Sequence, residues 1–101
     1  MERRQKGKRD MLKIAVVEDQ EETRERLCGF IRQYAGEQGL QVEVTAYADG
    51  ALLAKEYHPG SYDILFMDVE MPMLGGFSTA ERIREVDTET VLVFVTNMAQ
   101  Y

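Results

Sequence analysis

The chain is short of the residues that several classes of enzyme and secreted protein require. Of its 101 residues, one is a cysteine and one is a histidine. A single cysteine excludes an intramolecular disulfide and favours a reduced, cytoplasmic compartment. Cys28 is better explained as a small buried hydrophobic residue than as a reactive thiol. His58 precedes Pro59-Gly60 and is better explained as a turn residue than as a catalytic base. The residues that a catalytic triad or a histidine-based metal site requires are therefore missing.

Long apolar runs and an excess of basic residues are also absent. The longest apolar runs are strand-sized, far below the roughly 20 residues of a membrane-spanning helix. The net charge of −6 argues against nucleic-acid binding by this domain, because such binding depends on neutralising phosphates. Gly75-Gly76 lacks the pattern of a phosphate-binding or dinucleotide-binding loop. With 101 residues, 45% of them apolar, the chain is predicted to be one globular domain.

The first ten residues differ from the rest of the chain. They hold five of the twelve basic residues, which leaves seven basic against sixteen acidic residues from Met11 onward, a net charge of −9. No apolar stretch follows that could serve as a signal-peptide core, so secretion is not expected. A basic interaction arm is one interpretation of residues 1–10, and a leader or expression remnant is the one we prefer. We therefore predict that the domain occupies residues 11–101.

From Met11 onward, strand-like and helix-like segments alternate. Four strands are predicted from apolar runs of suitable length: residues 12–17 (LKIAVV), 42–47 (VEVTAY), 62–67 (YDILFM) and 91–95 (VLVFV). The second run is the most polar, as expected near a sheet edge. An order of βαβαβαβ implies an α/β fold, with a parallel sheet and helices on both of its faces.

The three intervening segments have helical periodicity. The first is predicted to run from residue 21 to about residue 35 and to end at Gly36 or Gly39. Asp49 is the expected N-cap of a short second helix, and a third helix follows Gly76. The apolar residues that recur at helical spacing are Leu27, Phe30, Ile31 and Tyr34 in the first helix, Leu52, Leu53 and Tyr57 in the second, and Phe77, Ala80 and Ile83 in the third.

Three of the predicted strands end in acidic or hydroxyl-bearing residues. Glu18 and Asp19 follow the first strand, Asp68 follows the third with Glu70 two residues later, and Thr96 follows the fourth. Open parallel sheets bind ligands at the carboxyl ends of their strands, so these side chains are expected to converge. One acid at a strand end would be explained as solvated surface. Carboxylates from two strands with a hydroxyl from a third favour a functional site.

The chemistry of such a cluster is restricted. Crowded carboxylates repel one another, which raises the pKa of at least one of them unless a cation joins them. Oxygen ligands of this kind suit Mg²⁺. A carboxylate can also attack a phosphoryl donor and form an aspartyl phosphate, with a metal and a hydroxyl stabilising the transferred group. Asp68, which follows the apolar run ILFM, is the expected nucleophile.

In their order and spacing, VVED at 16–19, LFMDVEMP at 65–72, Gly76 and FVTN at 94–97 resemble the receiver domains of bacterial two-component response regulators. The resemblance covers essentially all of residues 11–101. It implies a flavodoxin-like, doubly wound α/β fold. It also implies Mg²⁺ as a cofactor, a sensor histidine kinase as a partner, and no enzymatic activity beyond slow autodephosphorylation.

The resemblance gives each residue of the cluster a role. It makes Asp68 the phosphoacceptor, Asp19 a direct metal ligand and Glu18 a second acid that often reaches the metal through water. It makes the backbone carbonyl of Glu70 a further metal ligand and Thr96 the switch hydroxyl. The tail FVTNMAQY is also similar to regulators with a LytTR-type DNA-binding output domain. That similarity implies transcription regulation through a domain outside this chain.

The sequence departs from the family in two places. Gly75 stands where the family often has an acidic residue. The chain stops at Tyr101, whereas a receiver normally continues through a fourth helix, a fifth strand, a phosphoryl-pairing lysine and a fifth helix. Lys13 and Lys55 lie in the first strand and the second helix, so neither fits that role. We therefore expect strand order 2-1-3-4, impaired phosphorylation or read-out, and self-association through an exposed apolar edge at residues 91–95.

Two other classes of protein fit part of the pattern. Phosphohydrolases similar to haloacid dehalogenases also use an aspartyl nucleophile, but they place two aspartates after the first strand, whereas Asp68 and Glu70 follow the third. A second alternative is an interaction module that keeps the receiver fold without being phosphorylated. The presence of Asp19, Asp68 and Thr96 argues against loss of function by substitution, so the phosphoacceptor module is preferred.

Overall fold

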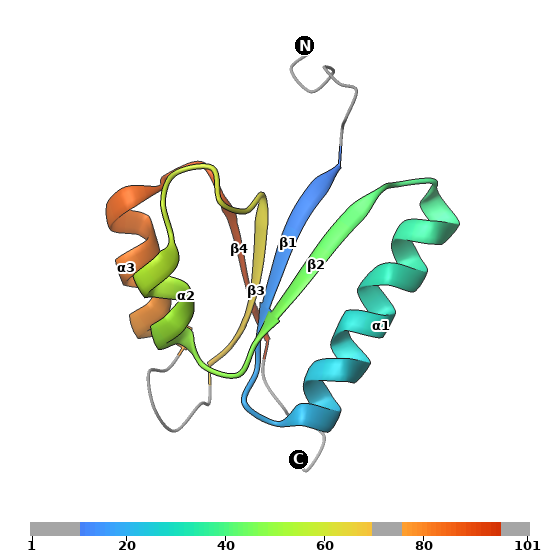
Figure 1. Ribbon diagram of the computed structural model, residues 1–101, viewed down its shortest axis with the longest axis horizontal. Helices are drawn as coiled ribbons and strands as arrows, with labels where there is room; N and C mark the ends of the chain where they lie inside the picture. Colours follow the sequence, from blue (N-terminus) through green and yellow to red (C-terminus); the bar gives the residue numbers. More distant parts are fainter. Residues whose placement is uncertain (1–10, 70–75, 96–101) are drawn as a thin grey trace.

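The computed structural model describes residues 11–69 and 76–95. The four strands within these residues form one parallel sheet in the order β2-β1-β3-β4, with α1 on one face and α2 and α3 on the other (Figure 1). The predicted α/β class and strand order are confirmed. In chain order the elements are β1 (Leu12–Val17), α1 (Glu21–Gln38), β2 (Val42–Tyr47), α2 (Gly50–Glu56), β3 (Ile64–Asp68), α3 (Gly76–Val86) and β4 (Val91–Val95).

β1 and β3 occupy the centre of the sheet, and both are largely apolar, as expected of the inner strands of a parallel sheet. Ala15 and Val17 of β1 have no exposed surface, and neither do Leu65 and Met67 of β3. The main hydrophobic core lies between the sheet and the α2–α3 layer. Its buried members are Ala15, Val17, Leu53, Tyr57, Leu65, Met67, Ala80 and Ile83.

α1 begins where the sequence predicts but ends at Gln38 rather than near residue 35. Gly39 follows the helix with a φ of 73°, and its N–H donates to the carbonyls of Ala35 and Gly36. This left-handed conformation is one that glycine adopts without strain. Gly39 therefore ends the helix, and Gly36 remains inside it.

The apolar stripe predicted for α1 is only partly buried. Phe30 and Tyr34 are each 60% exposed, whereas Cys28 and Ala35 are buried. Cys28 and Ala35 are seven residues apart and so share one side of the helix, which lets α1 approach the sheet through small side chains. The larger aromatic residues consequently flank the contact. In α3, Phe77 is likewise 62% exposed, in contrast to the buried Ala80 of the same predicted face.

α2 begins as predicted at an aspartate N-cap. The Oδ1 atom of Asp49 accepts hydrogen bonds from the N–H groups of Ala51 (2.8 Å) and Leu52 (3.3 Å). The helix then passes close to α3 at Gly50, where a Cβ atom would overlap the side chain of Thr79. The first residue of α2 therefore has to be glycine for the two helices to keep this spacing.

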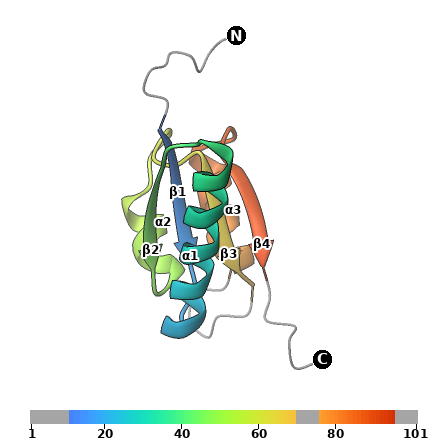
Figure 2. The ribbon, with the colours of Figure 1, turned by 90° about the vertical axis from the view of Figure 1, so that its right-hand side faces the viewer.

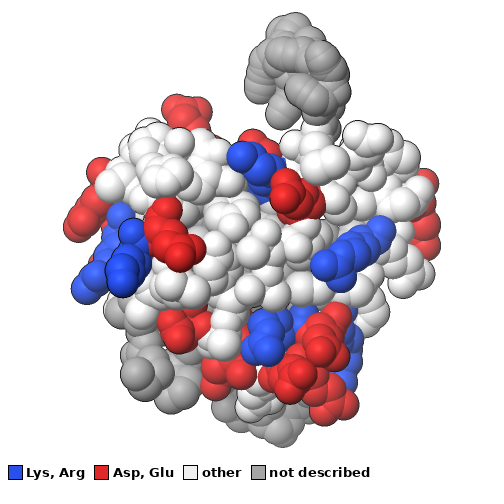
Figure 3. Space-filling model, in the orientation of Figure 1, with Lys and Arg blue, Asp and Glu red and all other residues white. Residues whose placement is uncertain are grey.

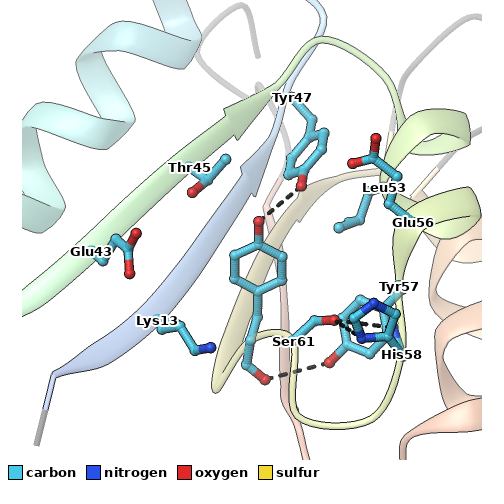
Figure 4. A pocket seen from close by; sticks show the side chains of 10 residues that line it. Lys13, Glu43, Thr45, Tyr47, Leu53, Glu56, Tyr57, His58 and Ser61 are labelled. Atoms are coloured by element: carbon cyan, nitrogen blue, oxygen red, sulfur yellow. Dashed lines mark hydrogen bonds between the residues drawn. The ribbon is translucent and has the colours of Figure 1, made fainter.

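The turn between α2 and β3 includes His58, as the sequence predicts. The His58 N–H donates to Ser61 Oγ (3.0 Å), and the His58 carbonyl accepts from the Ser61 N–H (2.9 Å) (Figure 4). β3 begins at Ile64 and not at Tyr62 as predicted. The Tyr62 hydroxyl lies 2.8 Å from that of Tyr47. The two rings border a cavity of about 350 Å³ beside β1 and β2 (Figure 4).

Asp87 joins the segments at the amino ends of β3 and β4. Its Oδ2 atom accepts from the Tyr57 hydroxyl (2.7 Å) and the Gly60 N–H (3.2 Å). Its Oδ1 atom accepts from the N–H groups of Glu89 (2.9 Å) and Thr90 (3.3 Å). The Tyr57 hydroxyl lowers the pKa of Asp87, and the backbone N–H groups lower it further. Burial raises the pKa of Tyr57 to about 12.

Candidate functional site

The ends of β1 and β3 bring three of the predicted acids together. Val17 of β1 is in register with Met67 of β3, so Glu18 and Asp68 leave neighbouring strands at the same end of the sheet. The Glu18 N–H donates to the Tyr47 carbonyl at 3.0 Å, which fixes the end of β1 against β2. In Figure 3, several acidic side chains gather at the lower end of the molecule, where the carboxyl ends of the strands lie.

Glu18, Asp19 and Asp68 form a compact acidic cluster. One carboxylate oxygen from each lies within 4.8 Å of the other two. Glu18 and Asp68 are each only 4% exposed, and Asp19 is more accessible. In the part of the chain that the structure describes, this is the one group of three or more histidine, cysteine, aspartate or glutamate side chains close enough to hold a metal ion.

The turn after β1 is held by hydrogen bonds that orient the cluster. The Gln20 N–H donates to Glu18 Oε2 (3.0 Å). Arg24 Nη1 reaches back from α1 and donates to the backbone carbonyls of Glu18 (2.9 Å) and Asp19 (3.4 Å). Arg24 is thus a positioning residue that sequence reasoning missed. In the sequence, Arg24 is indicated only as a basic residue near the start of α1. Arg26 has the same position in the pattern but pairs with Glu22 on the surface, at 3.6 Å.

The electrostatics of the cluster favour a cation. Burial raises the pKa of Glu18 to about 7, the Gln20 N–H opposes that rise, and the neighbouring Asp68 and Asp19 add to it. Near neutral pH, Glu18 therefore retains a proton in part of the population unless a positive charge replaces it. All three donors are carboxylate oxygens, the ligands that Mg²⁺ prefers. The residues present therefore fit a divalent metal.

Three of the five predicted site residues lie among the described residues. It brings Glu18, Asp19 and Asp68 together, whereas Glu70 and Thr96 lie outside the described residues. The two described lysines are in the elements where the sequence predicted them: Lys13 is in β1, beside the cavity of Figure 4, and Lys55 is in α2. Among the helices of residues 11–69 and 76–95, none is long and apolar enough to cross a membrane.

Comparisons with known proteins agree with this geometry. Residues 14–101 match the response regulator receiver domain family. The transcriptional regulatory protein RprY of Bacteroides fragilis is 31% identical over 86% of this chain. The transcriptional regulatory protein DltR of Streptococcus agalactiae is 30% identical over 88% of it. The chain spans 34% and 37% of the lengths of these two relatives.

A solved structure shares the fold. The non-phosphorylated HemR receiver domain from Leptospira biflexa superimposes with a TM-score of 0.67 and 26% sequence identity. The match covers 87% of this chain and 66% of that one. The described fold is therefore similar to that of a known receiver domain.

Proposed function

The chain belongs to the response regulator receiver domain family, and from this membership we propose that Asp68 accepts a phosphoryl group from a sensor histidine kinase. The observation that carries the proposal is the convergence of Asp68 with Glu18 and Asp19 at the ends of two buried strands. A receiver needs this arrangement because its nucleophile and its metal ligands must meet at one point. The protein would act as a signalling module and not as an enzyme with turnover.

The proposed reaction is a phosphoryl transfer. A carboxylate oxygen of Asp68 forms a bond to phosphorus while the bond from phosphorus to the donor breaks, and the donor leaves with the bonding electrons. Asp19 and Asp68 would hold Mg²⁺ directly, Glu18 through water, and Glu70 through its backbone carbonyl. Bound Mg²⁺ would neutralise negative charge on the transferring group. Thr96 would supply the hydroxyl that contacts a phosphoryl oxygen.

The read-out is proposed to lie outside this chain. RprY and DltR are both transcriptional regulatory proteins, which supports a DNA-binding output domain and a cytoplasmic location. The LytTR type of output stays a prediction from the motif at residues 94–101. We also propose self-association through β4, because its sequence VLVFV contains neither charge nor proline.

One alternative function keeps the same fold. A domain that binds its partners without phosphorylation would need neither Mg²⁺ nor a reactive Asp68. The burial and mutual approach of the three acids favour the phosphoacceptor, because crowded buried carboxylates cost stability. A fold selected only for binding would have no reason to retain them together.

The direct test is incubation of the protein with acetyl phosphate and Mg²⁺, followed by intact-mass measurement. We expect a gain of one phosphoryl group, about 80 Da, which is absent from Asp68→Asn and from samples with excess chelator. Glu43→Gln, which neutralises an exposed acid of β2, is the matched control and should gain the same mass. No gain in the unsubstituted protein, together with no Mg²⁺ binding by calorimetry, would favour the interaction module.

A further inference from the structure

A cavity lies between the sheet and α2, on the face opposite α1. α2 has seven residues and a length of about 10 Å, whereas β2 has six residues and spans about 20 Å. The helix therefore covers only part of the strand. In its layer, α2 lies on the β2 side and α3 on the β4 side (Figure 2). The uncovered part of β1 and β2 borders the cavity of about 350 Å³ in Figure 4, whose lining falls within residues 13–62.

Three polar side chains line this cavity from the two strands (Figure 4). Alternate residues of a strand point to the same face of the sheet. Ala15 of β1 belongs to the core beneath α2 and α3, so Lys13, two residues earlier, points to that face as well. Glu43 and Thr45 share a face with Tyr47 of β2. The chain therefore has polar residues on a face of the sheet where a longer α2 would require apolar ones.

Lys13 and Glu43 place opposite charges side by side at the open end of the cavity. They are register partners in the parallel pair of β1 and β2, and both are exposed. Within residues 11–69 and 76–95, neither residue forms an ion pair. Glu56 of α2 adds a second acid to the lining. An ammonium group and a carboxylate are thus available to a ligand that carries both opposite charges.

The inner end of the cavity is apolar and aromatic. Leu53 has no exposed surface, and Tyr57 is only 8% exposed. The Tyr57 hydroxyl donates to Asp87 (2.7 Å), so its ring is what remains for a ligand to contact. The Tyr47 and Tyr62 hydroxyls lie 2.8 Å apart. Because one of them donates to the other, one O–H of the pair is left to donate to a ligand.

We propose that this cavity binds a free α-amino acid with an apolar side chain. The carboxylate of the ligand pairs with the Lys13 ammonium, its ammonium group pairs with the Glu43 carboxylate, and its side chain lies against Leu53 and the tyrosine rings. Both charged groups of an α-amino acid are attached to one carbon atom, which suits partners on adjacent strands about 4.8 Å apart. The cavity volume lies within the range of small-molecule sites, roughly 300–1,000 Å³.

The proposed ligand site is separate from the acidic cluster. Lys13 precedes Glu18 by five positions, which corresponds to about 16 Å along β1. None of the three acids of the cluster lines the cavity. The inference therefore goes beyond the phosphoacceptor function and does not depend on it.

Three ligands with the same apolar chain test the charge requirement. Leucine carries both charged groups, isocaproate lacks the ammonium group, and isoamylamine lacks the carboxylate. NMR chemical shifts of the isotope-labelled protein, followed during titration, give each dissociation constant and the residues affected. We expect leucine to bind at least about tenfold more tightly than either analogue, because each lost group removes a charge-assisted hydrogen bond. No saturable shift with leucine would overturn the proposal, and so would equal binding of either analogue.

Two substitutions test the charged residues individually. Lys13→Met removes the ammonium group, and Glu43→Gln removes the charge of the carboxylate. Each should raise the dissociation constant of leucine about tenfold. In Lys13→Met the advantage of leucine over isoamylamine should disappear, and in Glu43→Gln so should its advantage over isocaproate.

A lysine outside the cavity provides the matched control. Lys55 is an exposed residue of α2 that does not line the cavity, so Lys55→Met should bind leucine as the unsubstituted protein does. Circular dichroism of each variant verifies folding. An equal loss of leucine binding in all three variants, or a loss in none of them, would overturn the proposal.

The outcome is separable from the phosphoacceptor proposal. Neither Lys13→Met nor Glu43→Gln changes an acid of the cluster, so both variants should still gain a phosphoryl group on Asp68. Loss of leucine binding with phosphorylation intact would support a second site. Leucine-induced shifts confined to the acidic cluster would overturn the proposal, because they would place the ligand there and not in the cavity.

Discussion

Replacing Glu18 with glutamine is expected to stabilise the metal-free protein, although Glu18 is nearly buried and hydrogen-bonded. Glutamine keeps an oxygen that can accept the Gln20 N–H, which Glu18 Oε2 accepts at 3.0 Å. It removes one of three carboxylates whose oxygens lie within 4.8 Å of one another. The variant therefore removes the cost of burying a charge, together with its repulsion by the neighbouring acids, and retains the hydrogen bond that orients the turn.

Two estimates give the magnitude. Two unit charges 4.8 Å apart repel by about 3 kcal/mol at an effective dielectric constant of about 20. Burial and the neighbouring acids raise the pKa of Glu18 from 4.5 to about 7, which also corresponds to about 3 kcal/mol between protonation states. Because solvent and counterions screen part of this energy, we expect a net gain of about 1–3 kcal/mol.

The pH dependence identifies the cause. A carboxyl group with a raised folded-state pKa disfavours folding as it ionises. Its stabilising contribution is complete below pH 4.5 and is lost as the pH rises through about 7. The Glu18→Gln variant should therefore match the parent protein near pH 4.5 and exceed it at pH 8. Added Mg²⁺ should narrow the difference at pH 8, because the cation compensates the repulsion in the parent protein.

Urea denaturation followed by circular dichroism measures the effect. The midpoint should rise at pH 8 with no change in the slope m. Glu43→Gln removes an exposed acid outside the cluster, so its midpoint should change little. Equal stabilisation of Glu18→Gln at both pH values would refute the electrostatic explanation, and so would a loss of stability at pH 8.

Three further predictions follow from described contacts. Gly50→Ala should lower the free energy of unfolding by about 1–3 kcal/mol, measured in urea, because its Cβ overlaps Thr79. Asp87→Asn should destabilise the protein at pH 7. Because the pKa of Asp87 is lowered, the stabilising contribution of its carboxylate is present above about pH 4 and is lost below it. On acidification to pH 3, the variant should therefore lose less stability than the unsubstituted protein. Arg24→Ala should weaken Mg²⁺ binding several-fold by calorimetry, since Arg24 positions the turn after β1, whereas Arg26→Ala should not.

The convergence of the acids could be predicted because it depends on topology alone. Parallel strands end at one edge of the sheet, so Glu18 and Asp68 meet whatever the details of packing. The packing of α1 depends on more than periodicity. A helical stripe containing Phe30 and Tyr34 gives the direction of the apolar face, but not which part of it contacts the sheet. The residues of α1 that are buried are the small Cys28 and Ala35.

Hydrogen bonds between distant segments of the chain could not be predicted from the sequence. The Asp63 carboxylate accepts a hydrogen bond from the backbone N–H of Lys13 (2.8 Å), and Lys13 lies fifty positions earlier in the chain. This contact fixes the chain just before β3. Arg24 orients the acidic turn through backbone carbonyls, and no local pattern separates it from Arg26. Both features depend on the folded arrangement of distant segments and not on the residues beside them.

The end of β3 that carries Asp68 is held by β4. Asp68 is in register with Val95, and the Val69 N–H donates to the Val95 carbonyl. The position of Asp68 in the acidic cluster therefore depends on a strand that carries none of the three acids of the cluster.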